Sequence, residues 1–305
     1  MLTDDIERYI ALRRSLGFKL QKPSRYLRSF ARFATDKGER HICAATAVAW
    51  AATAPTPYSR HYRLGYVVRL ARFLHAEEPA HEIPPANLFA TRKLRPVPYI
   101  YTREELARII ETAGQLRRQK PNPLRRQIYV TLFGLIAATG LRVSEALRLR
   151  LGDVLPGGVL HVRDTKFNKS RLVPLHKSVV EALERYLEMR RRFAGADDHV
   201  FLSVKGTALG YSAVNCTFRR VLQLANIAPG RTRRPRIHDL RHSFATRALE
   251  QCSTNRDAVA RHFVALATYM GHADIAHTYW YLQATPELMT DIAAAAEALV
   301  AGAAP

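Results

Sequence analysis

The sequence predicts a mainly α-helical protein with one small antiparallel β-sheet, divided into two domains. Three observations lead to this prediction. Residues 1–83 show helical spacing of apolar residues, with capping signals between the segments. Residues 84–98 contain four prolines and three basic residues, a composition typical of an extended linker. Residues 99–305 again show helical patterns, interrupted by two short apolar runs at 159–162 and 172–175 that indicate strands.

The first domain, residues 1–83, is expected to hold four helices. Thr3 can cap the first helix, which ends near Gly17. The second helix carries apolar residues on one face, namely Tyr26, Phe30, Phe33 and Ala34. Thr46 is expected to cap a short third helix. Thr56, followed by Pro57, is expected to begin a fourth, because proline suits the first helical turn.

The aromatic residues of the fourth helix allow two interpretations. Tyr62, Tyr66 and Phe73 are spaced so that they could pack in the core of the domain, which is the interpretation we favour. The arginines among the helices could form a solvated face, but the net charge favours contacts with phosphates.

The second domain, residues 99–305, opens with a helix and continues with alternating helices and turns. Thr102 followed by Glu105 is a capping box. The expected elements are a helix over 127–139 stopped at Gly140, a helix starting at 143, strands at 159–162 and 172–175 around a turn at 166–170, helices over 179–193 and 212–225, and a final amphipathic helix from Pro286.

The charge of the chain points to a polyanionic partner. The 305 residues carry a formal net charge of +21 at pH 7. Residues 1–98 hold 17 basic and 8 acidic side chains, and residues 99–305 hold 30 and 18. Since both domains are basic, both are expected to touch the same nucleic acid. A cationic surface that serves solubility alone is the alternative.

Cysteine usage and hydropathy exclude several classes of protein. Cys43, Cys216 and Cys252 are widely spaced, so neither a disulfide framework nor a zinc site is expected. No apolar run approaches the roughly 20 residues that cross a membrane. The first residues lack an export signal, so the cytoplasm, with association to the nucleoid, is the expected location.

Four motifs carry the chemistry. They are Gly140-Leu141-Arg142-Val143-Ser144-Glu145, then Lys166 to Leu175, then His238-Asp239-Leu240-Arg241, and finally Gly271-His272 with Tyr281 nine residues later. In this order and at these spacings they resemble the catalytic domain of the tyrosine recombinases, the phage integrase family. The resemblance covers roughly the last two thirds of the chain. It implies a helical core-binding domain over residues 1–83 that grips the far side of the DNA.

Arg142 and Arg241 are the expected clamps for a DNA phosphate. A phosphodiester carries one negative charge, and an arginine offers a planar fork that fits two oxygens and stays protonated. Glu145 lies three residues after Arg142 on the same helical face and can orient its guanidinium. His238 and Arg241 share the same spacing, whereas His242 is expected to pack. Each pair alone could be an ordinary surface contact.

The resemblance assigns Lys166 as the general acid that protonates the leaving 5′ oxygen. The family usually has glycine after this lysine, but this chain has Phe167 there, so Lys169 is the competing candidate. His272 would donate a hydrogen bond to a non-bridging phosphate oxygen. Met270 stands where the family usually has leucine.

The nucleophile must be chosen among Tyr269, Tyr279 and Tyr281. The attacking tyrosine of the family lies nine residues after the histidine that corresponds to His272, which selects Tyr281. On a helix Tyr279 would point about 200° away, so it is expected to pack.

The sequence thus predicts an enzyme that cleaves and rejoins DNA through a 3′-phosphotyrosyl intermediate, with no cofactor and no metal. Its partners would be double-stranded DNA with specific recombination sites and copies of itself, a dimer per site and a tetramer in synapse, with accessory recombinases left open. The amino-acid sequence around Tyr281 favours a role in integration, excision or transposition of a mobile element. The alternatives are a type IB topoisomerase-like enzyme and a non-catalytic DNA-binding protein on the same fold.

Overall fold

The computed structural model describes residues 2–89, 97–117, 124–163, 170–192, 197–203, 205–230, 234–251 and 256–271, the last with backbone alone for 256–259. The chain divides into two compact units, residues 1–95 and 96–305. The division falls within the proline-containing stretch at residues 84–98. Among the described residues, no helix combines the length and the apolar character that crossing a membrane requires.

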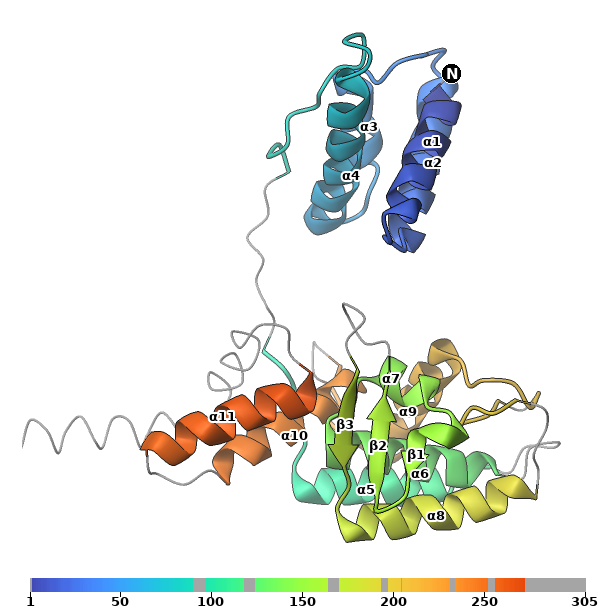
Figure 1. Ribbon diagram of the computed structural model, residues 1–305, viewed down its shortest axis with the longest axis vertical. Coiled ribbons are helices and arrows are strands. Elements are labelled where there is room, and N and C mark those ends of the chain that lie inside the picture. The colour runs from blue at the N-terminus through green and yellow to red at the C-terminus, as the bar shows by residue number, and fades with distance from the viewer. Residues whose placement is uncertain are drawn as a thin grey trace, which may run out of the picture. The chain divides into compact units, whose positions relative to one another are not determined.

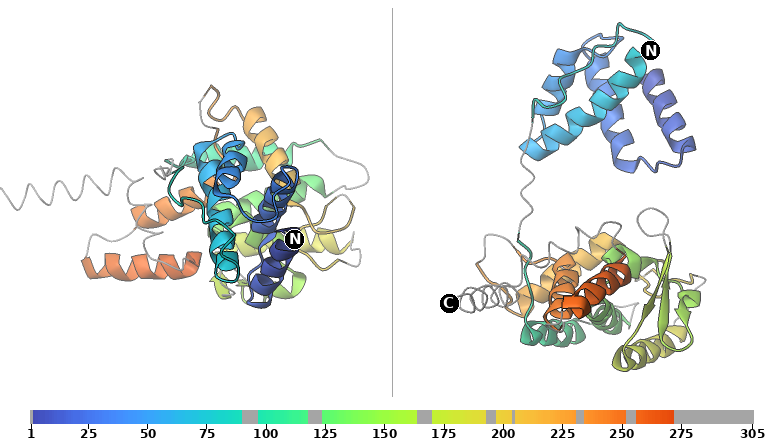
Figure 2. Two further views of the ribbon diagram at one scale, coloured as in Figure 1. Left: turned by 90° about the horizontal axis from the view of Figure 1, so that it is seen from above. Right: turned by 60° about the vertical axis from the view of Figure 1, so that its left-hand side comes forward.

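The N-terminal unit is a bundle of four helices around one apolar core (Figure 1). The helices are α1 (Leu2–Ser15), α2 (Gln21–Thr35), α3 (Ala44–Ala52) and α4 (Pro57–His75). Ile6, Phe30 and Leu64 are fully buried in this core. The views in Figure 2 show the same four helices from above and from the side.

Three predictions about these helices can be checked against their ends. The prediction for Thr3 is wrong, because α1 begins at Leu2 and Thr3 lies within the helix. Thr56 is the N-cap of α4 and its side chain accepts a hydrogen bond from the Ser59 N–H, so the predicted start at Pro57 is confirmed. The prediction for Thr46 is wrong, because α3 begins at Ala44 and its N-cap is Cys43. The hydroxyl of Thr46 donates to Glu39 instead, at 2.5 Å.

Tyr62 of α4 lies on the surface, although we favoured packing in the core. Tyr62 is 40% exposed, while Tyr66 and Phe73 are partly buried against the core. Tyr62 packs beside Tyr58 with ring centroids 4.5 Å apart, and Tyr66 stacks on Tyr26 at 5.9 Å. The predicted core position of Tyr62 is therefore wrong: the residue belongs to an exposed row of aromatic rings.

The C-terminal unit is mainly helical with one small sheet, as predicted. Its described helices are α5 (Arg103–Gly114), α6 (Arg125–Thr139), α7 (Val143–Arg148), α8 (Lys177–Arg191), α9 (Tyr211–Leu224), α10 (His238–Glu250) and α11 (Arg256–Met270), with a short 3-10 turn at Leu151–Asp153. The capping box of Thr102 and Glu105 at the start of α5 is confirmed.

The sheet has three antiparallel strands in the order β1-β2-β3, which lie side by side in Figure 1. They are β1 (Val154–Leu155), β2 (Val159–Val162) and β3 (Arg171–Pro174). Leu160 pairs with Val173 in the register, and both side chains are fully buried. The inner face of the sheet thereby joins the core of the unit.

The central helix of this core is α6. Leu132, Phe133 and Ile136 are fully buried, and α5, α8 and α10 all pack against the helix. α11 packs against α10 and reaches β3, where the Tyr269 hydroxyl donates to the Pro174 carbonyl at 3.2 Å. The ends of α6, α11 and β3 are thereby brought to one region.

Candidate active site at the end of α11

A tight turn between α6 and α7 positions Arg142. Gly140 ends α6 in the left-handed conformation, with φ of 62°. A Cβ atom at Gly140 would lie 2.5 Å from the Phe244 ring, so the backbone approaches α10 more closely than a larger residue allows. Arg142 follows as the N-cap of α7. Its guanidinium therefore emerges at the junction of α6, α7 and α10.

Glu145 connects two arginines through one buried carboxylate. The side chain is 1% exposed. Its oxygens accept from Nη1 of Arg142 at 2.6 Å and from Nη1 and Nη2 of Arg171 at 3.2 and 2.9 Å. The backbone N–H of Arg142 donates a fourth hydrogen bond at 3.0 Å.

The charge state of Glu145 follows from these contacts. Desolvation raises the pKa of its carboxyl, but the hydrogen bonds and positive charge of Arg171 and then Arg142 outweigh burial and lower the pKa to about 2. Glu145 is therefore ionised at neutral pH.

Arg171, at the start of β3, is a residue that the sequence analysis missed. In addition to its two bonds with Glu145, its Nε donates to the carbonyl of Tyr269 at 2.8 Å. The side chain is only 11% exposed. The only sequence signal was an arginine at the edge of an apolar strand, which also describes an ordinary exposed residue.

Arg241 reaches the same place from α10. It is 2% exposed, and its guanidinium donates to the carbonyls of Gly140 at 2.5 Å and Met270 at 2.8 Å. Arg241 lies about 100 residues from Arg142 in the sequence, and the fold brings both to the end of α11.

His238 lies one helical turn before Arg241 and remains exposed at the surface. Its ring packs edge-on against the buried His242, at 4.8 Å between centroids. Partial desolvation and the positive charge of Arg241 and Arg236 lower the pKa of His238 to about 4. His238 is thus neutral at pH 7.

Three successive carbonyls at the end of α11 each accept a hydrogen bond from a different arginine. Tyr269 accepts from Arg171, Met270 from Arg241, and Gly271 from Nη2 of Arg142 at 3.1 Å. Carbonyls at a helix C-terminus lack intrahelical partners and carry partial negative charge, so guanidinium groups stabilise them. The arginines therefore form one cluster around the residue that precedes His272.

Several predicted site residues fall outside the described part of the chain: Lys166, Lys169, His272, Tyr279 and Tyr281. Of the three tyrosines considered as nucleophile, the structure describes Tyr269. Its ring stacks on Phe244 and its hydroxyl donates to Pro174. Burial raises the pKa of this hydroxyl above its ordinary value.

Two groups within the described ranges bring together residue types that can bind metals, and neither includes a residue of the arginine cluster. They are His41 with Glu78 and His81, and Asp197 with Asp198 and His199. The Ile42 N–H donates to Nδ1 of His81, which leaves a proton on Nε2 where a metal would bind. Asp197 accepts from the His199 backbone N–H and ring and from the Ala208 N–H. Protein partners thus already use these atoms.

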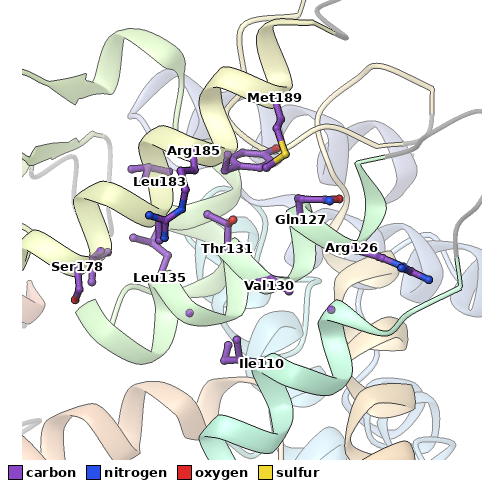
Figure 3. A pocket seen from close by; sticks show the side chains of 15 residues that line it. Ile110, Arg126, Gln127, Val130, Thr131, Leu135, Ser178, Leu183, Arg185 and Met189 are labelled. Carbon is purple, nitrogen blue, oxygen red and sulfur yellow. The ribbon is translucent and has the colours of Figure 1, made fainter.

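A pocket of about 480 Å³ lies between α5, α6 and α8 (Figure 3). Apolar side chains such as Ile110, Val130 and Leu183 line it, with Arg185 and Arg126 beside them. None of its lining residues belongs to the arginine cluster.

Comparisons with known proteins agree with this fold. The sequence model described as "Phage integrase family" matches residues 100–287. A Sinorhizobium fredii protein named "Putative integrase/recombinase y4rB" is 37% identical, over 94% of each chain. The tyrosine recombinase XerD of Brucella abortus biovar 1 is 29% identical, over 77% of this chain and 74% of XerD.

Solved structures of recombinases share the fold. The XerH site-specific recombinase bound to its palindromic difH substrate superposes with a TM-score of 0.66 at 19% identity, covering 90% of this chain and 78% of XerH. The integrase of the transposon Tn1549, in complex with transposon right end DNA, gives a TM-score of 0.63 at 16% identity, covering 92% of this chain and 94% of that one.

The fold and these relatives define the class of protein, an enzyme of site-specific DNA recombination. Within that class, the chain belongs to the phage integrase family, the tyrosine recombinases.

Proposed function

We propose that this recombinase cleaves DNA through a covalent 3′-phosphotyrosyl intermediate formed on Tyr281. The observation that supports this most is the convergence of Arg142 and Arg241 on the last carbonyls of α11, directly before His272. The order and spacing of the motifs, which match those of the family, also support the proposal. We further propose Lys166 as general acid, His272 as a donor to the phosphate, and Glu145 as the residue that orients Arg142.

The chemistry balances without an external cofactor. The Tyr281 hydroxyl releases its proton to solvent as its oxygen bonds to phosphorus. The bond from phosphorus to the 5′ oxygen breaks, and Lys166 supplies the proton to that oxygen. Arg142 and Arg241 stabilise the charge on the non-bridging oxygens as it shifts in the transition state. A phenoxide is a good leaving group, so a DNA 5′-hydroxyl can reverse the attack and rejoin a strand.

Arg142 has the donors that this role requires. An arginine carries five N–H groups, and the described contacts of the Arg142 side chain use one on each of its two Nη atoms. Its side chain is 27% exposed. The remaining N–H groups can face a phosphate while Glu145 and Gly271 hold the guanidinium in orientation.

The N-terminal unit, with residues 1–83 as its helical core-binding domain, is proposed to hold the DNA. Its α2 and α4 carry exposed arginines beside partly buried tyrosines. Arg25 lies over Tyr26 at 5.8 Å, and Arg69 lies over Tyr66 at 4.8 Å. Arginines bind phosphates, and amphipathic tyrosines beside them can contact the sugar edges of a groove.

The biological setting we propose is a mobile genetic element. The Sinorhizobium fredii integrase/recombinases y4rB and y4rE match at 37% and 35% identity over 94% of this chain, compared with 29% over 77% for XerD. For assembly we propose a dimer on each site and a tetramer in the synapse. Lambda integrase, which shares the fold, forms a dimer on a core site and a tetramer on a Holliday junction.

Substitution of the two C-terminal tyrosines tests the proposed function. Tyr281→Phe should abolish covalent protein–DNA adducts and leave DNA affinity nearly unchanged, because only the nucleophilic oxygen is lost. Tyr279→Phe is the matched control and should still form adducts. Adducts that persist in Tyr281→Phe and disappear in Tyr279→Phe would show that the other tyrosine attacks.

A further inference from the structure

We propose that Arg171 is a positioning residue for DNA cleavage, which sets both the guanidinium of Arg142 and the end of α11. The inference rests on the proposed function and adds to it a residue that touches neither the DNA nor the reacting atoms. Arg171 would act through Glu145 on one side and through the Tyr269 carbonyl on the other.

The contacts of Arg171 with Glu145 form a two-pronged pair inside the protein. Nη1 and Nη2 of Arg171 lie 3.2 and 2.9 Å from the two carboxylate oxygens. The side chains are 11% and 1% exposed. By comparison, the pair of Arg150 and Asp198 in the same unit has side chains 55% and 53% exposed. A buried guanidinium that makes two hydrogen bonds to a carboxylate holds that carboxylate in one geometry. An exposed ion pair contributes little to stability or orientation.

Glu145 transmits this restraint to Arg142. The same two carboxylate oxygens accept from Nη1 and from the backbone N–H of Arg142. Without Arg171, the carboxylate would lose two of its four described hydrogen bonds and could rotate within its site. Arg142 would then lose the fixed orientation that a clamp on a phosphate requires.

The second contact of Arg171 holds the chain just before His272. Its Nε donates to the carbonyl of Tyr269 at 2.8 Å. Its guanidinium also lies against Gly271, where a Cβ atom would be 2.7 Å from Nη1. Gly271 has φ of 67°, so glycine satisfies both the left-handed backbone and the close approach. Arg171 thereby fixes where α11 ends.

Lysine cannot reproduce these contacts. Its ammonium is a single point charge, whereas Arg171 uses three nitrogens in one plane to reach three acceptor atoms on two different elements. Arg171→Lys therefore keeps the charge and most of the volume while it removes the geometry. Arg150→Lys, at the exposed pair with Asp198, is the matched control.

The experiment measures single-turnover adduct formation on a nicked suicide substrate, together with the Kd for the same DNA. Rates are measured at saturating protein, below the unfolding transition of each variant, with Arg171→Gln as a second variant. We expect Arg171→Lys to lower the saturating rate at least about tenfold, because small misplacements of a clamp are costly. The Kd should stay within about twofold, and Arg150→Lys should match wild type.

A double variant tests the route through Glu145. Because Arg171 acts in part through the carboxylate, Arg171→Lys combined with Glu145→Gln should lose less rate than the product of the two single losses. Rate losses that multiply would contradict the inference, as would a wild-type saturating rate in both Arg171 variants. A weaker Kd with an unchanged saturating rate would indicate a DNA contact instead. Failure of the wild-type protein to form any adduct would refute the proposed function itself.

Discussion

Glu145 is a single buried carboxylate that accepts hydrogen bonds from two guanidinium groups. Its folded pKa is about 2, below the ordinary value of 4.5. Between these values the unfolded chain binds a proton that the folded chain does not, so stability rises with pH. The contribution is fully present above about pH 4.5 and is lost as the pH falls through about 2.

Replacing Glu145 should therefore change how the free energy of unfolding depends on pH. We expect Glu145→Gln to lower the free energy of unfolding at pH 7 by on the order of 3 kcal/mol, because a pKa difference of one unit corresponds to about 1.4 kcal/mol. Urea unfolding from pH 7 to pH 3 measures this. The variant should lose less stability than wild type over that range, and parallel curves would show that Glu145 does not titrate as described.

The roles of Lys166 and Lys169 can be distinguished by whether the leaving group of the substrate needs a proton. A substrate with sulfur in place of the bridging 5′ oxygen needs no protonation of its leaving group. If Lys166 is the general acid, Lys166→Ala should be slow on normal DNA and largely restored on the sulfur substrate. Lys169→Ala is the control and should show no such rescue. Rescue of Lys169→Ala alone would move the assignment to Lys169.

Sequence motifs identified four residues of the described site and missed a fifth. Arg142, Glu145, His238 and Arg241 were selected from motifs, and the contacts of Arg142 with Glu145 follow from their spacing. Arg171 was missed, because its partners lie 26 and 98 residues away in the sequence. No local pattern records such contacts, which arise only when β3 and α11 come together.

At the scale of elements, the turn that joins α6 to α7 depends on one glycine. Gly140 has φ of 62°, and a Cβ atom there would meet the Phe244 ring at 2.5 Å. We expect Gly140→Ala to destabilise the protein by about 2–4 kcal/mol, from the left-handed conformation and the overpacking together. Urea unfolding would measure it, with Gly152→Ala as control because nothing lies within 4 Å of its added Cβ. Equal stability of both variants would contradict this account of the turn.

Elements with a chemical signal at their ends were predicted well. Thr56 with Pro57, Thr102 with Glu105, and Gly140 each provide a specific hydrogen bond or backbone conformation, and the corresponding helix ends were found. β1 was not predicted, since two residues carry no periodicity. Thr46 was wrongly taken as a cap, because its hydroxyl bonds to the distant Glu39 and not to its own helix.

At the scale of the whole molecule, the net charge of +21 is spread over both units. Such a charge favours association with DNA and makes the affinity depend on salt.

The net charge could be predicted from the amino-acid composition. The sequence did not predict which tyrosines of α4 are exposed. Tyr62 and Tyr66 have the same helical spacing and differ only in what packs over them.

Residues 286–305 lie outside the described part of the chain, and their sequence predicts an amphipathic helix. The helix could fold back on its own domain, but from the family resemblance we propose that it docks on a neighbouring protomer. Fully burying each large apolar side chain there contributes roughly 1.5–3 kcal/mol. Deleting residues 286–305 should leave single-site DNA binding mostly intact and greatly reduce synapsis and recombination.

Gel-shift and synapsis assays would measure both effects, and mixing the truncated chain with full-length Tyr281→Phe protein would test docking between protomers. A truncated chain that assembles and recombines normally would exclude the docking role. Loss of folding would instead indicate that the helix packs on its own domain.

The most direct measurement of the central claim is mass spectrometry of the covalent complex. Wild-type protein is reacted with a nicked suicide substrate, the DNA is digested to a residual nucleotide, and the modified peptide is sequenced. We predict one modified residue, Tyr281, linked through phosphate to a 3′ end, with a free 5′-hydroxyl on the released strand. A nucleotide on any other residue, or cleavage that leaves no covalent bond, would contradict it.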